Sequence, residues 1–191
     1  MNRKILIWIF FGFHSLVPID SLARESNSFY EFYKLFKNSP PAQYQVTGTI
    51  CEQVAKKQLE SYFSDPEYTI QTGITYQRNG KTLGELDLVV FRNSDHQAIL
   101  VGEVKCRRNL VRARRKAKQQ LKRFAYAIES KTPMEIFDPD HPEARYHFSQ
   151  FENIKSWITI SQKGGKRAGF DWALDLTLHQ LLKLRRKLLT E

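Results

Sequence analysis

Three charged residues interrupt apolar segments in the middle of the chain, and their types and spacing could support catalysis. Asp87 precedes Leu88-Val89-Val90, and Glu103 and Lys105 flank Val104. Alternate side chains of a strand share a face, so Glu103 and Lys105 project together while Val104 points to the other side. A charge on an apolar strand costs free energy unless it is paired or binds a metal. We therefore interpret these three residues as a candidate site.

Two carboxylates and an ammonium group suit the hydrolysis of a phosphodiester bond. Carboxylate oxygens are the ligands that a hard cation such as Mg²⁺ prefers. A bound divalent cation lowers the pKa of a coordinated water and neutralises the charge that develops on the phosphate. An ammonium group on the same face can orient the attacking water and stabilise the transition state. The residues thus predict metal-dependent catalysis, with Mg²⁺ or Mn²⁺ as the cofactor.

Hydrophobic periodicity places these residues on strands with helices on either side. Alternation and turn signals predict an antiparallel meander of three strands, at 68–77, 82–91 and 97–106, with an Asn79-Gly80 turn. Further strands are expected at 157–161 and 170–176, and helices at 28–36, 48–63, 112–130 and 178–189. Thr47 or Thr49 is available to cap the second helix. This order suits an α/β fold with a single mixed sheet flanked by helices.

The ordered motifs resemble those of the PD-(D/E)XK nuclease superfamily. The segment Gly84-Glu85-Leu86-Asp87 is followed, after fifteen residues, by Glu103-Val104-Lys105. This order is similar to the pattern in small bacterial relatives of archaeal Holliday-junction resolvases. The segment Gly48-Thr49-Ile50-Cys51-Glu52 matches the Gly-x-x-x-Glu pattern of an upstream helix in that family. The resemblance covers residues 48–130 and departs from the family motif at Leu86, where the motif has proline. It implies a restriction endonuclease-like fold with a mixed central sheet.

The resemblance also implies roles for individual residues. It assigns metal binding to the side chains of Glu52, Asp87 and Glu103 and to the carbonyl group of Val104. Lys105 is implied to serve the attacking water, and Gln120, on the inward side of the following helix, to be a further catalytic residue. Phe124 stands where the RecB-like branch has tyrosine, so the resemblance is to the superfamily and not to that branch. Glu85 is expected to point away from the site and to pair with an arginine.

The charge of the chain favours a polyanionic partner. Its net charge is +10 over 191 residues, and Lys and Arg release counterions when they neutralise phosphates. We expect nucleic acid, DNA rather than RNA, ahead of an anionic membrane surface. The residues expected to contact it lie on or just before the 112–130 helix: Arg107, Arg108, Arg112, Arg115, Lys116, Gln119 and Arg123.

The N-terminus has the order of a secretory signal peptide. Asn2-Arg3-Lys4 precede an apolar run, and Ser21-Leu22-Ala23 supplies small residues at its first and third positions. We expect residues 1–23 to be removed, leaving one domain at 24–191 in a periplasmic or secreted protein without a stable membrane span. The alternatives are an uncleaved membrane anchor and a buried N-terminal helix.

Together these observations predict a single-domain metal-dependent nuclease, endonuclease or exonuclease, that acts on DNA. The main alternative is a catalytically inactive nucleic-acid-binding protein of the same fold. A third interpretation is a membrane-anchored repair or restriction factor that faces the cytoplasm. Junction-cleaving relatives act as dimers, so a homodimer is an open question. Cys51 and Cys106 would permit one disulfide in an oxidising compartment, but the sequence does not show whether they are close.

Overall fold

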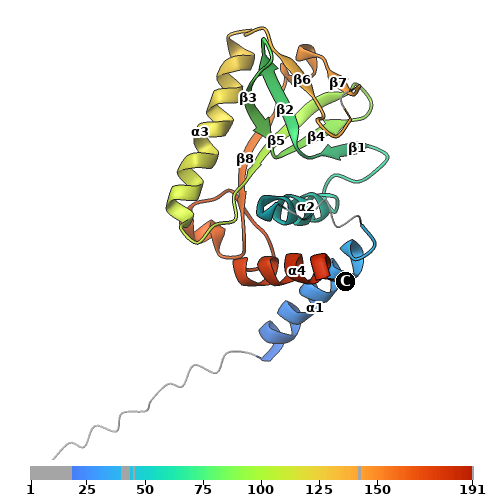
Figure 1. Cartoon of the computed structure of the whole chain (residues 1–191), viewed down its shortest axis with the longest axis vertical. Coiled ribbons are helices and arrows are strands. Elements are labelled where there is room, and N and C mark those ends of the chain that lie inside the picture. Colours follow the sequence, from blue (N-terminus) through green and yellow to red (C-terminus); the bar gives the residue numbers. More distant parts are fainter. Residues whose placement is uncertain (1–18, 40–43, 45, 142, 191) are drawn as a thin grey trace, which may run out of the picture.

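The computed structural model describes residues 19–39, 44, 46–141 and 143–190, with the backbone alone for residues 19–27 and 47. Helices surround a mixed five-stranded sheet, so the predicted α/β class with a mixed central sheet is confirmed (Figure 1). Most of the predicted signal peptide lies outside the described residues.

The central sheet combines antiparallel and parallel pairs. In spatial order its strands are β1 (Tyr68–Gln71), β4 (Leu88–Arg92), β5 (Gln97–Val104), β8 (Ser156–Ser161) and β9 (Trp172–Ala173). β1, β4 and β5 pair antiparallel, whereas β8 is parallel to both β5 and β9. A parallel pair needs a long crossover, and the chain between β5 and β8 accordingly contains the helix α3 (Leu110–Glu129).

A second sheet of four strands corrects the prediction of a single sheet. Its strands are β3 (Lys81–Leu86), β2 (Ile74–Arg78), β6 (Glu135–Phe137) and β7 (Arg145–Tyr146). The strand predicted at 68–77 is divided near Gly73, whose φ of 74° favours glycine, and the strand predicted at 82–91 is divided at Asp87. The predicted Asn79-Gly80 turn is confirmed, with positive φ at both residues.

Two hydrophobic cores cover the two faces of the central sheet. On one face, α1 (Ile19–Phe36), α2 (Thr47–Leu59) and α4 (Leu178–Thr190) share a core with Val90 and Val104. On the other face, α3 and the second sheet pack against Val89 and Val101 (Figure 1). Two short 3₁₀ helices, Phe148–Phe151 and Gly165–Ala168, complete the fold. The central strands are therefore buried on both sides, which explains their nearly continuous apolar sequences.

Helix starts differ in detail from the predictions. The N-cap of α2 is Val46, whose side chain makes no capping hydrogen bond, so the expected caps Thr47 and Thr49 are wrong and both lie within the helix. α3 begins at Leu110, because the side chain of Asn109 accepts a hydrogen bond of 2.9 Å from the backbone N–H of Arg112.

The first described helix extends across the expected cleavage point. α1 begins at Ile19, well before the predicted start at residue 28, and Ala23 lies inside it. Among the helices of the described ranges, none has the length and apolar character needed to cross a membrane.

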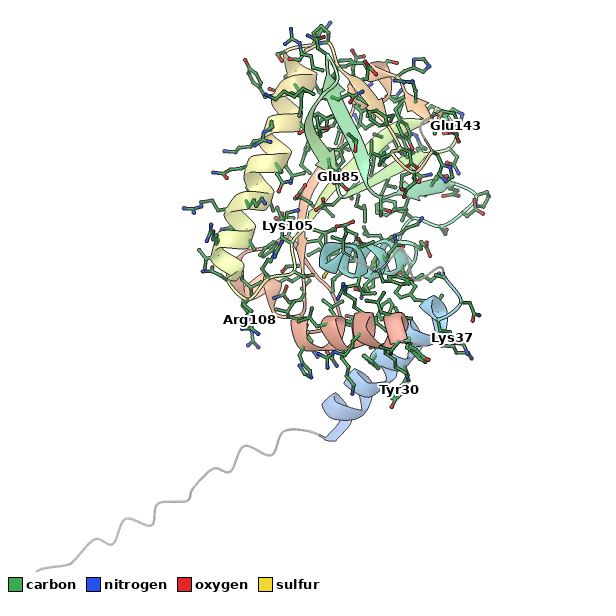
Figure 2. All side chains as sticks on the ribbon, in the orientation of Figure 1. Tyr30, Lys37, Glu85, Lys105, Arg108 and Glu143 are labelled. Carbon is green, nitrogen blue, oxygen red and sulfur yellow. The ribbon has the colours of Figure 1, made fainter. Side chains whose placement is uncertain are left out.

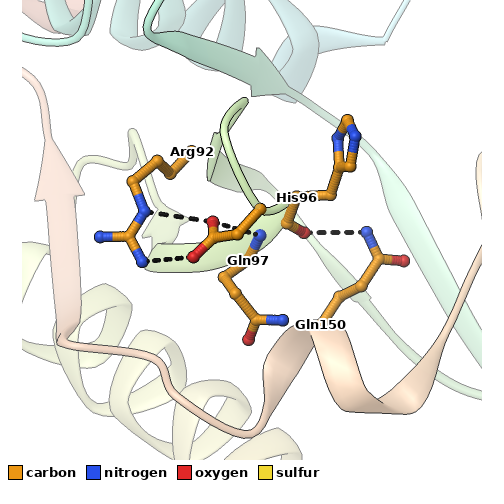
Figure 3. Close-up of polar contacts among 5 residues, drawn as sticks. Arg92, His96, Gln97 and Gln150 are labelled. Atoms are coloured by element: carbon orange, nitrogen blue, oxygen red, sulfur yellow. Dashed lines mark hydrogen bonds and ion pairs between the residues drawn. The ribbon is translucent and has the colours of Figure 1, made fainter.

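The turn between β4 and β5 is fixed by side chains and helps to set the register of the two strands (Figure 3). The carboxylate of Asp95 accepts hydrogen bonds from Arg92 at 3.1 and 2.5 Å and from the backbone N–H of Gln97 at 3.2 Å. Gln150 donates to the carbonyl of His96 at 2.9 Å. The register shifts by one residue between Val90 and Phe91, and beyond this irregularity Leu88 pairs with Gly102 at the far end of the two strands.

Candidate active site

The predicted catalytic residues meet where the chain passes from one sheet to the other. Asp87 lies between β3 and β4, which belong to different sheets. Because Leu88 pairs with Gly102 across an antiparallel pair, the next residues outward, Asp87 and Glu103, lie side by side. Figure 2 shows Lys105 just beyond the end of β5, in the region between α2 and α3.

One ammonium group joins the two carboxylates. Lys105 Nζ lies 2.7 Å from Asp87 Oδ2 and also contacts Glu103 Oε1. Asp87 Oδ2 accepts a second hydrogen bond, of 2.8 Å, from the backbone N–H of Val104. Asp87 is 5% exposed, Glu103 1%, and the side chain of Lys105 16%. The predicted convergence of these three side chains is therefore confirmed.

Two further glutamates, Glu52 and Glu85, interact with the acidic residues and Lys105. Glu52 on α2 interacts electrostatically with Asp87, Glu85 and Lys105, and Glu85 on β3 interacts with Asp87 and Lys105. A Cβ atom at Gly48 would lie 3.2 Å from Glu52 Oε1, which explains the glycine one turn before the glutamate. The expected pairing of Glu85 with an arginine is wrong, since no ion pair within the described ranges involves this exposed side chain.

The surplus of carboxylates changes the ionisation of the site. Burial raises the pKa of Glu103 to about 9 and the pKa of Glu52 to about 8, and the nearby charge of Asp87 contributes in the same direction. Burial opposes the charge of Lys105, but Asp87 and Glu103 outweigh it and raise the pKa of the ammonium group. Asp87 and Glu103 contact Lys105, and Glu52 and the exposed Glu85 add further acidic groups nearby. A divalent cation would relieve this excess of acid.

The donor set suits a hard divalent cation. Asp87 and Glu103 would supply the central oxygens, and Glu52 and the carbonyl of Val104 are the further ligands that would join them. Within the described part of the chain, no three His, Cys, Asp or Glu residues form a ready metal-binding group. The positive charge between Asp87 and Glu103 is supplied instead by Lys105.

Buried polar side chains of the neighbouring strand hold the backbone around Lys105. Its N–H donates to the carbonyl of Ile160 at 2.9 Å, and its carbonyl accepts 2.8 Å from the hydroxyl of Ser161. The side-chain amide of Gln162 donates to the carbonyl of Arg107 at 2.8 Å and accepts from its N–H at 3.2 Å. Sequence analysis missed Ser161 and Gln162, because their function depends on a contact across the sheet.

Gln120 faces inward as predicted, whereas Gln119 is exposed. The side-chain oxygen of Gln120 is buried and has no hydrogen-bond partner among the described residues. A buried acceptor without a partner is costly, and such a group suits a role that involves a ligand. Among the described residues, no hydrogen bond joins the side-chain oxygen of Gln120 to the acidic residues, so its catalytic role stays a prediction.

All the residues predicted to contact nucleic acid are exposed: Arg107, Arg108, Arg112, Arg115, Lys116, Gln119 and Arg123. Arg107 and Arg108 lie between β5 and α3, and the other five lie on α3. Arg123 also donates to the carbonyl of Leu83 on β3 at 3.2 Å. The structure therefore places a basic surface directly after the strand that carries Glu103.

The two cysteines, whose proximity the sequence left open, lie together. Both are free thiols, and the hydrogen bond between them, together with burial, raises the pKa of Cys51. Cys51 precedes Glu52 on α2, and Cys106 follows Lys105. Their contact therefore joins α2 to the end of β5 beside the acidic residues.

Comparison with known proteins gives no match, whether to protein-family models, curated proteins or solved structures.

Without divalent cations, the melting temperature is expected to fall as pH rises from about 4.5 to about 9. Glu52 and Glu103 have raised pKa values in the folded protein, so unfolding releases protons within this window. Their stabilising contribution is complete below pH 4.5 and is lost as pH rises through the folded pKa values of about 8 and 9. Thermal melts in EDTA across this range measure the effect.

Glu52→Gln should flatten this pH dependence, whereas Glu129→Gln, at an exposed position on α3, should leave it unchanged. Addition of Mg²⁺ or Mn²⁺ should restore the melting temperature at high pH. A melting temperature that stays level across the window would contradict the raised pKa values.

Proposed function

We propose that the protein is a metal-dependent nuclease of the PD-(D/E)XK type that hydrolyses phosphodiester bonds, with DNA as its substrate and Mg²⁺ or Mn²⁺ as its cofactor. The observation that carries this proposal is the convergence of Asp87 and Glu103 on Lys105, within a group of four carboxyl groups. Two buried carboxyl groups with two more nearby suit a cation, and the exposed basic surface beside them suits a polyanion.

Different residues of the site would have different roles in hydrolysis. Asp87 and Glu103 would hold the cation, with support from Glu52 and the carbonyl of Val104. When bound, the cation would supply an activated water and neutralise the charge that develops on the phosphate. The raised pKa of Lys105 keeps it an ammonium group at neutral pH. It therefore acts as a hydrogen-bond donor that orients water and stabilises negative charge, and not as a general base.

The rest of the site would position the nucleic acid. The basic surface from Arg107 to Arg123 would hold the phosphate backbone, an interaction that sets position without reading sequence. The buried amide of Gln120 would complete the site on the side of α3. The acidic residues themselves would repel the backbone, so the neighbouring basic surface is needed for binding.

A cleavage assay with matched variants tests this proposal. Plasmid, linear, single-stranded and branched DNA are incubated with the protein in Mg²⁺, Mn²⁺ or EDTA, beside Lys105→Ala and Asp87→Ala. Lys155→Ala is the control, since Lys155 is exposed just before β8, at the end remote from the site. Removal of the Lys105 ammonium group should lower the cleavage rate on the order of 10²-fold to 10³-fold, as for other groups that stabilise developing charge.

The outcome separates the enzyme from its main rival. Loss of cleavage with retained DNA binding in both site variants supports the nuclease. Equal behaviour of all the proteins, with binding but no cleavage in any metal, supports a nucleic-acid-binding protein in which Lys105 only balances buried charge.

We also propose that the protein is exported and acts on DNA outside the cytoplasm. The basic, apolar and small-residue order of residues 1–23 supports this location. N-terminal sequencing of the mature protein is the test. A mature chain that begins after Ala23 supports export, whereas a retained N-terminus indicates a membrane anchor or a buried helix.

A further inference from the structure

A cationic cavity opens beside the acidic residues and shares Lys105 with them. Its volume is about 500 Å³. Five of the seven residues that line it are basic, and none is acidic. The basic residues are Lys105, Arg107, Arg108, Arg112 and Lys116, and the other two are Asn109 and Ala113. Figure 2 shows Lys105 and Arg108 near the beginning of α3, where this cavity lies.

Most of the positive charges of the cavity have no ion-pair partner among the described residues. Lys105 is ion-paired with Asp87 and Glu103, but the other four basic side chains make no ion pair with the described residues. These four are exposed: Arg107, Arg108, Arg112 and Lys116. Exposed like charges around one cavity repel one another weakly in water, and a bound anion would interact favourably with all of them.

The walls of the cavity are nevertheless fixed in place. The backbone of Arg107 is held through two hydrogen bonds by Gln162. The side chain of Asn109 caps α3 through the backbone N–H of Arg112, so the charge of the cavity comes from side chains and not from a free helix end. A site with a fixed backbone and exposed cationic groups suits a phosphate, whose oxygens accept several charge-assisted hydrogen bonds.

The number of cations distinguishes between two kinds of phosphate. An internal phosphodiester carries one negative charge, whereas a terminal phosphomonoester carries close to two at neutral pH and has three terminal oxygens. Four unpaired cations exceed what one internal phosphate requires. The volume of about 500 Å³ is also larger than a phosphate needs and lies within the range of small-molecule sites.

We propose that this cavity binds the phosphorylated end of a nucleic-acid strand, with the terminal phosphate on Arg107, Arg108, Arg112 and Lys116. The choice of nucleic acid as the ligand rests on the proposed function. Because Lys105 borders both regions, a strand held by its end in the cavity would place a nearby bond at the acidic residues. The protein would then prefer phosphorylated ends to internal sites.

Binding of matched oligonucleotides tests this inference without requiring cleavage. Duplexes of one sequence, with a phosphate or a hydroxyl group at the 5′ end or at the 3′ end, are titrated with the full chain in EDTA and followed by fluorescence anisotropy. The wild-type protein should bind one of the phosphorylated ends about tenfold more tightly than its hydroxyl counterpart, as expected for added charge-assisted hydrogen bonds.

Two cavity variants and one control make the result specific. Arg112→Gln and Lys116→Gln should each remove most of the preference for the phosphorylated end. Arg115→Gln removes the same charge from an exposed position on α3 outside the cavity, and should weaken binding of all ends alike. Equal wild-type affinity for phosphate and hydroxyl ends would overturn the inference, as would an undiminished preference in both cavity variants.

This result is independent of the outcome for cleavage. A phosphate preference in a protein that never cleaves DNA would reject the proposed nuclease and keep the end-binding site. Cleavage without any phosphate preference would keep the nuclease and reject this site, leaving the cavity as a contact for internal phosphates.

Discussion

Asp87→Asn is expected to abolish metal-dependent cleavage while it raises the melting temperature of the metal-free protein above about pH 9, where Glu52 and Glu103 are ionised. The charge of Asp87 raises the pKa of Glu52, Glu85 and Glu103, which means that it makes their ionised forms less stable. Asparagine keeps an oxygen that can accept the hydrogen bond from the N–H of Val104 but carries no charge. The substitution therefore relieves repulsion in the fold and removes a central metal ligand.

The cleavage rate in Mg²⁺ should fall on the order of 10³-fold or more, as for the loss of a central catalytic group in other enzymes. DNA binding in EDTA should be retained, and thermal melts in EDTA should show the stabilisation. Glu129→Gln, which removes an exposed carboxylate from α3, is the matched control and should change none of the three measurements. Wild-type cleavage by Asp87→Asn would exclude a catalytic role for Asp87.

The sign of the stability change separates a functional cluster from a structural ion pair. If Asp87, Glu103 and Lys105 only stabilised the fold, removal of a carboxylate or of the ammonium group would destabilise it, because either change would leave a buried charged partner unpaired. In a site with surplus acid, loss of a carboxylate stabilises the metal-free fold and loss of Lys105 destabilises it. Buried acids that lower stability but are needed for activity are a known cost of function.

The sequence predicted which segments form strands but not where the strands change partners. Alternating side chains continue through Gly73 and Asp87, so nothing in the local pattern marks either break. The division depends on which distant strands pair, since the segments on either side of Asp87 belong to different sheets. Asp87 was thus predicted as a residue within a strand, whereas the structure places it at the bend that leads into the site.

The central residues of the site were predictable for a simple reason. Charges on apolar strands are costly, and the spacing of Glu103 and Lys105 fixes them on one face. Glu52 entered only through the resemblance of the Gly48-to-Glu52 segment to a family motif. Glu85 was available from the same two-residue rule, because it stands two residues before Asp87 in the strand predicted at 82–91, but it was interpreted as a partner of an arginine.

Other parts of the site required the three-dimensional structure. The support from Ser161 and Gln162 depends on the parallel pairing of β5 with β8, and strand pairs so far apart in sequence leave no local signal. The contact between Cys51 and Cys106 likewise depends on the packing of α2 against the end of β5.

Treatment with a small disulfide such as oxidised glutathione is expected to join Cys51 to Cys106 and to stabilise the fold. Cys106 is the more exposed thiol, so its thiolate attacks the reagent first and releases one reduced glutathione. Cys51 then displaces the second glutathione and forms the protein disulfide, so that two thiols are oxidised and one disulfide is reduced. The contact between the two thiols means that little rearrangement is needed.

The new bond would close a loop of about 55 residues, which corresponds to about 4 kcal/mol from the unfolded-chain entropy that it removes. For a domain of this size, the melting temperature should rise by about 10 °C. Intact mass under non-reducing conditions measures the loss of two hydrogen atoms, and thermal melts measure the stabilisation. Cys106→Ser should show neither change, and stable glutathione adducts on the wild-type protein would contradict the expected pairing.

The position of this bond links stability to the site. Cys51 and Cys106 are the immediate neighbours of Glu52 and Lys105, so a disulfide would hold α2 against β5 across the group of carboxylates whose repulsion acts to separate them. Because the disulfide stabilises the fold through the unfolded chain, it should raise the melting temperature in EDTA at every pH from about 4.5 to about 9, including the range in which ionisation of Glu52 and Glu103 destabilises the metal-free fold. In an oxidising compartment, such as the one that the N-terminal segment predicts, this bond would let the fold tolerate its acidic site before a metal binds.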